Sequence, residues 1–320
     1  MRVDKIYFTV ILKNMSNNSQ IKTITSSIQI DGHKYVAHHP ANLATRTGSV
    51  WMFIHGIAVT PAFWEPLMPA QFHDTAPWIS VSLPVHAPST GPDGFSQEQV
   101  TPDLFNRLNG AILDQLIPDR DVVIVGHSTG GFAGLCLALA RPKRVRGVIS
   151  VGGFADGKWV GLEGDMQLMA RKEKLGAFGP TALKLTAWLT TRWPWLHART
   201  ASMFAHDKRA FLADKPSKIA LRLMRRDARL QNQDQLIAFF AGIRDVDIWK
   251  QIPSIQQPVL VLDGEFDPVI PADKTLRLAK ELPNSQLLLY PNVGHMVMNE
   301  RREDFWRDIL AWQTELFPKG

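Results

Sequence analysis

Cysteine is almost absent from this chain of 320 residues. Its one cysteine, Cys136, excludes an internal disulfide and any metal site built from several thiolates. A lone thiol favours a reducing compartment, so we expect a cytoplasmic protein, and its position in an apolar run predicts a packed core residue. Long apolar runs are also lacking, because no stretch approaches the roughly 20 residues of a membrane-spanning helix. The sequence therefore predicts a soluble globular protein with one large core or two lobes.

The N-terminal segment has more than one interpretation. Residues 1–27 form a mostly polar leader, which we expect to be disordered. An apolar stretch at residues 6–12 is at the short limit for a signal peptide, and no small-residue cleavage site follows it. A natural start at Met15 would make the preceding residues an extension. The sequence leaves these alternatives open.

Short apolar runs alternate with helical patterns along most of the remaining chain. Residues 27–40 alternate apolar and polar side chains around Asp31-Gly32, which predicts a β-hairpin. Continuous apolar runs predict strands that are buried on both faces, at residues 49–56, 77–84, 122–126, 144–154, 258–264 and 285–291. Helical spacing predicts helices between them, at residues 60–72, 97–117, 129–141, 271–282 and from about residue 300. This order predicts an α/β protein with a mostly parallel central sheet flanked by helices.

Residues 155–250 interrupt the alternation. No apolar run typical of a buried strand occurs there. Breaks at Gly-Pro, Lys-Pro and Asn separate three predicted helices, at residues 179–193, 215–230 and 232–243. We therefore expect a core of residues 28–154 and 251–320, with a helical cap inserted over the sheet. The aromatic residues of the cap suggest an apolar pocket beneath it, although tryptophans at helical spacing are more often packed core.

Positive charge is concentrated in the cap. Residues 155–250 hold 17 Lys and Arg against 10 Asp and Glu, whereas the rest of the chain holds 19 against 20. This excess fits either an anionic substrate or surface, or solvated helix faces, which are the more common case. No module of interleaved aromatic and basic residues is recognisable, so we expect a small-molecule substrate and no nucleic-acid partner. The sequence does not predict an oligomeric state.

One pentapeptide carries the strongest chemical signal. Gly126-His127-Ser128-Thr129-Gly130 matches the pattern G-x-S-x-G, which is weak by itself because short glycine patterns arise by chance. Here it follows a predicted buried strand and opens a predicted helix, which is the strand-turn-helix setting of a nucleophile elbow. Such a turn holds the serine in a strained conformation, and the glycines let strand and helix approach closely. The nearby helix N-terminus favours negative charge on a reacting oxygen.

A serine hydroxyl needs a general base, and the base needs an acid that orients it. Asp267 follows one predicted strand and His295 follows the last one. Loops at the carboxyl ends of parallel strands are where sites collect, so Ser128, Asp267 and His295 are expected to lie together. Asp156 also follows a predicted strand and is a rival acid, although its surroundings match the motif less well.

Together these motifs resemble the α/β-hydrolase superfamily. The resemblance covers about residues 30–315, and four landmarks match in order: FIHG, GHSTGG, GEFDPVIP and NVGHMVMNERREDFWRDI. It implies the α/β-hydrolase fold, and residues 155–250 are similar to the helical cap that many members insert after the sixth strand. Some members use an acid after that strand, so the resemblance also leaves Asp156 as a rival.

The resemblance implies a role for each motif residue. Ser128 would be the nucleophile, His295 the general base and then acid, and Asp267 the residue that orients the histidine. The backbone N–H groups of Ile57 and Thr129 would form the oxyanion hole. These roles imply an acyl-enzyme and hydrolysis of a carboxylic ester, thioester or lactone of a largely apolar small molecule.

Other functions fit the same triad. The GHSTGG elbow is similar to that of esterases and of cofactor-free haloperoxidases or perhydrolases, and carbon–carbon bond hydrolysis is a further alternative. A hydrolase-fold ligand receptor with slow turnover is an alternative of another class. Dehalogenases are disfavoured because their nucleophile is a carboxylate, and lipases with an HGGG hole because this chain has HGIA.

No cofactor and no metal are expected. His55 and His127 lie inside motifs, where we expect packing or shaping of the oxyanion hole. The metal-binding spacing H-E-x-x-H is absent from His38, His39, His73, His86, His197 and His206.

Overall fold

The computed structural model describes residues 6–9, 23–171 and 175–316. Within these ranges a nine-stranded sheet has the order β1-β2-β3-β5-β4-β6-β7-β8-β9. The strands are β1 (Ile6–Thr9), β2 (Thr23–Ile30), β3 (His33–Pro40), β4 (Val50–Ile54), β5 (Trp78–Val81), β6 (Val122–His127), β7 (Val145–Val151), β8 (Val259–Gly264) and β9 (Ser285–Tyr290). Strands β5, β4, β6, β7, β8 and β9 pair in parallel, whereas β1, β2 and β3 form an antiparallel extension at one edge.

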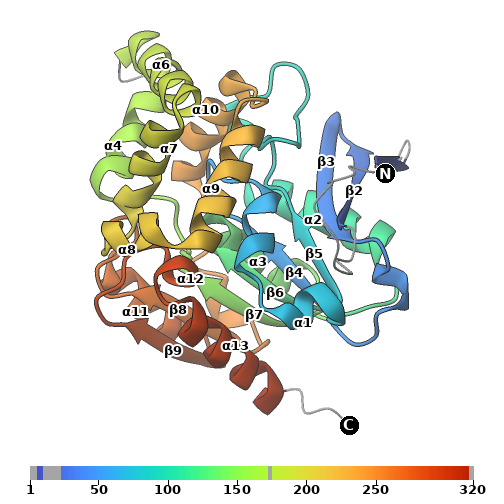
Figure 1. Cartoon of the computed structure of the whole chain (residues 1–320). Coiled ribbons are helices and arrows are strands. Elements are labelled where there is room, and N and C mark those ends of the chain that lie inside the picture. The colour runs from blue at the N-terminus through green and yellow to red at the C-terminus, as the bar shows by residue number, and fades with distance from the viewer. Residues whose placement is uncertain (1–5, 10–22, 172–174, 317–320) are drawn as a thin grey trace.

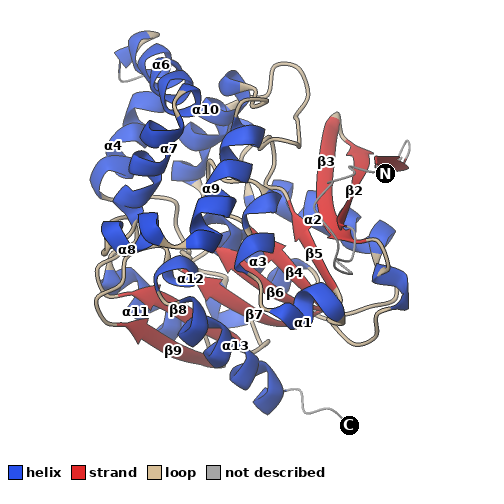
Figure 2. Ribbon diagram, viewed as in Figure 1, coloured by secondary structure: helices blue, strands red, loops and turns tan. Residues whose placement is uncertain are grey.

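Helices flank this sheet (Figure 1, Figure 2). The α-helices are α1 (Ala70–Asp74), α2 (Pro102–Leu116), α3 (Thr129–Ala140), α4 (Gly161–Ala170), α6 (Phe178–Arg192), α7 (Pro194–Ala201), α8 (Lys208–Ala213), α9 (Lys215–Ala228), α10 (Gln233–Gly242), α11 (Ala272–Glu281), α12 (Val297–Glu300) and α13 (Arg302–Leu316). The 3-10 helices are η1 (Leu43–Thr45), η2 (Pro61–Phe63), η3 (Glu65–Leu67), η4 (Gln97–Gln99), η5 (Ser202–Phe204), η6 (Ile243–Asp245) and η7 (Ile252–Ser254). The α/β fold with a mostly parallel sheet is confirmed. Within the described ranges, no helix combines the length and apolar character needed to cross a membrane.

Alternate residues of the parallel strands enter two hydrophobic cores. Met52 of β4 belongs to the same core as Phe132 and Cys136 of α3, so the prediction of a buried thiol is confirmed. The next residue, Phe53, belongs to the other core, where its ring centroid lies 6.1 Å from that of Trp306 in α13. Successive side chains of a strand point to opposite faces, so a strand covered on both faces must be apolar throughout.

The predicted hairpin is confirmed as β2 and β3. Ile28 pairs with Tyr35, and the two residues of the turn, Asp31 and Gly32, have φ angles of 50° and 76°. Two successive positive φ angles are typical of the type I′ turn that Asp-Gly favours.

Two parts of the expected leader are strands. β1 pairs antiparallel with β2, and β2 itself begins at Thr23. The sheet therefore begins before residue 28, because backbone hydrogen bonds along an exposed strand edge can recruit a further short strand. The other parts of the leader, residues 1–5 and 10–22, lie outside the described residues.

The helix predicted over residues 60–72 is wrong for most of its length. The chain forms the 3-10 helices η2 and η3 there, and only then the short helix α1. Pro61, Pro66 and Pro69 explain the difference. Proline has no N–H to donate, so it fits only at the start of a helix: Pro61 and Pro66 lie in the first turns of η2 and η3, and Pro69 precedes α1.

The described chain between β7 and β8 contains the helices predicted for the cap, and these lie together to one side of the sheet (Figure 1). The two ends of the insertion meet at its base. Gly157 N–H donates to Val246 O at 3.0 Å, and Ile248 N–H donates to Ala155 O at 2.9 Å. We therefore propose residues 155–250 as the cap.

Two glutamine side chains attach the cap to the loop after β5. Gln235 of α10 accepts a hydrogen bond from Gly91 N–H and donates one to Gly91 O, both at 3.0 Å. Gln231 accepts from Ala87 N–H at 2.8 Å and donates to Val85 O at 2.7 Å. Each side-chain amide thus satisfies backbone groups of the loop as a neighbouring strand would.

We expect Gln235→Leu to lower the free energy of unfolding by about 1–3 kcal/mol, because the backbone groups of Gly91 lose their partners. Urea unfolding followed by tryptophan fluorescence measures the change. Gln233→Leu is the matched control on the same helix, because the Gln233 side-chain oxygen has no hydrogen-bond partner among the described residues. Equal stability of the two variants would contradict this account of how the cap is attached.

Candidate active site

Strand β6 turns sharply into helix α3 at Ser128. Ser128 has a φ of 55° and a ψ of −118°, a conformation that is strained for a residue with a side chain. A Cβ atom at Gly126 would lie 2.2 Å from Gly130 O, and a Cβ atom at Gly130 would lie 2.2 Å from Ile54 O. Strand and helix can therefore approach this closely only with glycine at both positions, as the nucleophile-elbow motif predicts.

His295 and Asp267 are in contact in the loops that follow β9 and β8. His295 Nδ1 lies 2.5 Å from Asp267 Oδ2, and the two side chains are 5% and 1% exposed. Asp267 Oδ1 also accepts hydrogen bonds from the N–H groups of Val269 and Ile270, at 2.6 and 2.9 Å. Burial opposes the charge on Asp267, but His295 and the hydrogen bonds outweigh burial and hold the pKa of Asp267 below its ordinary value. The carboxylate is therefore ionised and directed at the histidine ring.

Backbone contacts bring Ser128 beside this pair. Ser128 N–H donates to Val151 O at 2.8 Å, and the residue after Val151 is Gly152. A Cβ atom at Gly152 would lie 2.8 Å from His295 Nδ1 and 3.3 Å from Asp267 Oδ2. Gly152 has a φ of 54°, so both its conformation and its surroundings require glycine. The segments that carry Ser128, His295 and Asp267 are thus neighbours at one end of the sheet.

A second carboxyl, which the sequence analysis did not identify, lies behind the pair. Asp263 of β8 is fully buried and accepts hydrogen bonds from Thr275 Oγ1 at 2.6 Å and Gly264 N–H at 2.8 Å. Burial and the charge of Asp267 raise the pKa of Asp263 well above its ordinary value. This shift favours the neutral form of the Asp263 carboxyl, which could then donate its proton to the ionised Asp267. The signal that could have found it is an acidic residue near the end of the apolar strand VLVLDG.

The two motif histidines occupy structural surroundings, as expected. His55 Nδ1 donates to Gly56 O at 2.7 Å, its Nε2 accepts from Leu83 N–H at 3.0 Å, and burial lowers its pKa well below the ordinary value. His127 Nε2 donates to His295 O at 3.1 Å, and burial lowers the pKa of His127 to about 3. Both rings are therefore neutral, and each fixes backbone near the serine.

The backbone segments predicted for the oxyanion hole adjoin the serine. Thr129 follows Ser128 as the first residue of α3. Ile57 follows Gly56, where a Cβ atom would lie 3.2 Å from Ser128 Cβ. An oxyanion hole needs N–H donors next to the nucleophile. The backbone segments at Ile57 and Thr129 both lie next to Ser128.

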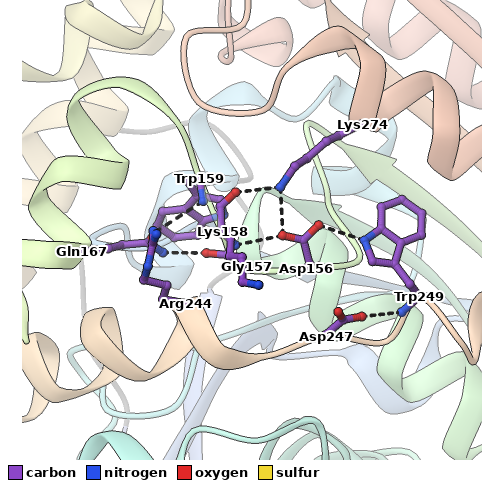
Figure 3. Close-up of polar contacts among 9 residues, drawn as sticks. All are labelled: Asp156, Gly157, Lys158, Trp159, Gln167, Arg244, Asp247, Trp249 and Lys274. Atoms are coloured by element: carbon purple, nitrogen blue, oxygen red, sulfur yellow. Dashed lines mark hydrogen bonds and ion pairs between the residues drawn. The ribbon is translucent and has the colours of Figure 1, made fainter.

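The rival acid, Asp156, forms hydrogen bonds with other residues at the base of the cap (Figure 3). Its carboxylate accepts hydrogen bonds from Lys274 Nζ and Trp249 Nε1, both at 2.8 Å. Burial opposes its charge, but these two partners more than offset burial and lower the pKa of Asp156. The acid in contact with His295 is Asp267.

The buried acids and the histidine also form a group that could hold a metal ion. Ligand atoms of Asp263, Asp267 and His295 all lie within 4.8 Å of one another. The separation of 2.5 Å between His295 Nδ1 and Asp267 Oδ2 argues against this use, because two ligands of a tetrahedral zinc ion lie about 3.4 Å apart. The contact fits a hydrogen bond better than a shared ion, and the expected absence of a metal stays a prediction.

A serine at a strand-turn-helix elbow, on a mostly parallel sheet with a helical insertion, defines the architecture of the α/β hydrolases. Residues 52–308 match the sequence model of the alpha/beta hydrolase family, and the chain belongs to this family.

Individual relatives are distant but cover most of the chain. A protein assigned as the carbamate hydrolase RutD, from Stutzerimonas stutzeri, is 26% identical over 263 residues, which cover 81% of this chain and 89% of that protein. A 2-hydroxy-6-oxononadienedioate/2-hydroxy-6-oxononatrienedioate hydrolase from Cupriavidus pinatubonensis is 25% identical over 225 residues, which cover 68% of this chain and 71% of that protein. The solved structure of an esterase from Thermogutta terrifontis is 18% identical and has a TM-score of 0.65, over 88% of this chain and 94% of that one.

We expect Asp267→Asn to lower kcat for ester hydrolysis about 10³- to 10⁴-fold, because the histidine then adopts the wrong tautomer. Asp156→Asn should keep kcat within about threefold and instead lower the free energy of unfolding by about 1–2 kcal/mol, through weaker bonds to Lys274 and Trp249. Kinetics with p-nitrophenyl acetate and urea unfolding of both variants separate the two effects. Loss of activity in Asp156→Asn alone would assign the acid to Asp156.

We expect Asp263→Asn to keep kcat within about fivefold, because the amide is uncharged and can donate to Asp267 while its oxygen accepts from Thr275, at the loss of the hydrogen bond from Gly264 N–H. The acidic limb of the pH profile of kcat/KM should stay in place. If Asp263 were ionised in the native protein, the substitution would remove a negative charge beside the pair and move that limb to lower pH. Such a shift would contradict the neutral state.

Proposed function

We propose that this protein is a serine hydrolase that cleaves carboxylic esters through an acyl-enzyme on Ser128. The observation that carries the proposal is the hydrogen bond between His295 and Asp267 beside a serine held at a φ of 55°. A serine hydroxyl becomes a useful nucleophile only with a base to take its proton. Because Asp267 engages Nδ1 of the ring, Nε2 is left as the basic nitrogen for the serine.

The proposed reaction has two halves. Ser128 Oγ attacks the ester carbonyl while His295 Nε2 takes the hydroxyl proton, and His295 then gives that proton to the departing alcohol. The resulting acyl-enzyme is attacked by water, which gives a proton to His295 as its oxygen bonds to the acyl carbon. Cleavage of the acyl–Oγ bond releases the acid, and His295 returns the proton to Ser128. Asp267 stays ionised throughout and stabilises the imidazolium that forms in each half.

Charge on the carbonyl oxygen is the second requirement. In each half-reaction this oxygen becomes negative, and the backbone N–H groups of Ile57 and Thr129 would donate to it. The N-terminus of α3, which begins at Thr129, adds a positive partial charge at the same place. No metal or cofactor is part of this scheme.

We favour an apolar small molecule as the substrate, because the cap residue Phe204 places its ring 6.3 Å from the ring of His295. The relatives widen the set of bonds to test, since one is assigned to carbamates and another to 2-hydroxy-6-oxo dienedioates. Both kinds of substrate offer a carbonyl to the same nucleophile. A cytoplasmic location stays part of the proposal and depends on the single cysteine.

We expect Ser128→Ala to lower kcat about 10⁴-fold or more, since the residual rate then comes only from binding and the oxyanion hole. The measurement is p-nitrophenol release from esters that range from acetate to dodecanoate, together with a p-nitrophenyl carbamate and a 2-hydroxy-6-oxo dienoate. The native protein should give a burst, and the best chain length would size the pocket. Ser150→Ala is the matched control, because this buried serine of β7 has no hydrogen-bond partner for its Oγ among the described residues.

Two outcomes would overturn the proposal. Turnover that survives in Ser128→Ala would place the nucleophile elsewhere. Rates near background for every substrate, with a change in tryptophan fluorescence on ligand binding, would instead favour a hydrolase-fold receptor.

A further inference from the structure

Helix α6 exposes an apolar stripe. Phe178, Leu185 and Trp188 share one face of the helix and are 71%, 56% and 56% exposed. The other face packs inside the cap, where Leu183 is buried. α6 lies at the edge of the cap far from the sheet (Figure 1). Large exposed apolar patches with a polar rim are typical of interaction sites.

The stripe continues through the corner between α6 and α7. Trp193 and Trp195 are 41% and 65% exposed, and the ring centroid of Trp193 lies 6.2 Å from that of Trp188. Core packing, which the sequence favoured for the cap tryptophans, is therefore wrong for these three. Tryptophan joins a large apolar ring to one N–H donor, and it is enriched where water meets lipid. We call the five residues Phe178, Leu185, Trp188, Trp193 and Trp195 the cap face.

A cationic pocket of about 340 Å³ adjoins the cap face between α7 and α9. Its lining includes Pro194, which separates the two tryptophans of the corner, and the cations Lys218, Arg222 and Arg225. No carboxylate among the described residues forms an ion pair with these three cations. His197 also lines the pocket, and its Nε2 is buried without a partner in the described part of the chain. Arg225 donates one N–H to Thr191 O and Arg222 donates its Nε–H to Lys218 O, so the other N–H groups of these cations are the donors that the pocket offers to an anion.

The chain segment around the pocket also carries a net positive charge. Residues 178–228 hold ten Lys and Arg against three Asp and no Glu. The three aspartates have local roles, because Asp214 and Asp227 form ion pairs with arginines and Asp207 caps α8. The positive charge that the sequence places in the cap is thus concentrated around the cap face.

We propose that the cap face docks on an anionic phospholipid surface, with its apolar side chains in the interface and a lipid phosphate in the cationic pocket. Aromatic and aliphatic anchors beside Lys and Arg are the combination that binds anionic membranes from one side. A second copy of this chain is a poorer partner, because it would bring two positive faces together. The inference does not depend on the reaction at Ser128.

Sedimentation of the full chain with sucrose-loaded vesicles tests the proposal. Vesicles of phosphatidylcholine with about one third phosphatidylglycerol should bind the protein, and binding should weaken as salt rises. Vesicles of phosphatidylcholine alone should bind far less.

Two variants address the two parts of the surface. Lys218→Gln/Arg222→Gln should lower the partition coefficient about 25-fold, at roughly fivefold for each cation. Trp188→Ser/Trp195→Ser should weaken binding to anionic vesicles by about tenfold or more and leave its salt dependence in place.

The matched control is Leu276→Ser/Lys280→Gln on α11. These residues are also exposed but lie outside the cap, so this variant should bind like the native protein. All three variants should keep the circular dichroism spectrum and the urea unfolding midpoint of the native protein, which establishes that they are folded.

Several results would overturn the proposal. The first is a native protein that ignores anionic vesicles, and the second is one that binds neutral vesicles equally well. Equal binding by the control and both cap variants would do the same. A native protein that is a dimer in sedimentation velocity, with a monomeric Trp188→Ser/Trp195→Ser variant, would assign the cap face to a second copy of the chain.

Discussion

The candidate site depends on the close approach of β6 and α3. At Gly126 and Gly130 a single additional carbon atom would overlap backbone atoms, and the serine between them takes a conformation that its side chain disfavours. The cost of this strain must be met elsewhere. Strand β6 lies between β4 and β7, with hydrogen bonds to both, and two cores cover its faces. A strained turn is sustained because the elements on both sides of it are fixed.

The strand β8 and the loop after it carry two carboxyl groups whose pKa values are shifted in opposite directions, upward for Asp263 and downward for Asp267. Asp267 receives two backbone N–H donors and faces His295, whereas Asp263 is enclosed and receives donors from Thr275 and its own neighbour. Two like charges at this separation in a buried place would repel strongly, so only one of them ionises. The surroundings decide which one. The neutral member then restrains the charged one, and the carboxylate can keep a single orientation toward the histidine.

Much of this arrangement could be predicted from the sequence, because its signals are local. The apolar runs of the parallel strands, the Asp31-Gly32 turn and the elbow around Ser128 each carry their information within a few residues. The apolar spacing of residues 60–72 predicts a helix, but Pro61 and Pro66 divide that segment into two short 3-10 helices.

Other features arise only from contacts between distant segments. Gly152 matters because His295, far along the chain, packs against it. In the sequence, Asp263 is simply a residue of an apolar strand. Its raised pKa depends on the charge of Asp267, which only the folded chain brings beside it. Periodicity finds the stripe on α6 but cannot tell whether that stripe faces the core or the surroundings.

The base of the cap has a consequence for how such a protein can change over evolutionary time. The segment that we propose as the cap begins at Ala155 and ends near Ile248, and these two residues are hydrogen-bonded neighbours. A segment whose two ends are adjacent can be replaced by another of different length without moving the strands on either side. The outer surface of the insertion can thus change while the chemistry at the sheet edge is kept, provided that cap residues in the two cores, such as Phe239 and Phe211, are kept as well.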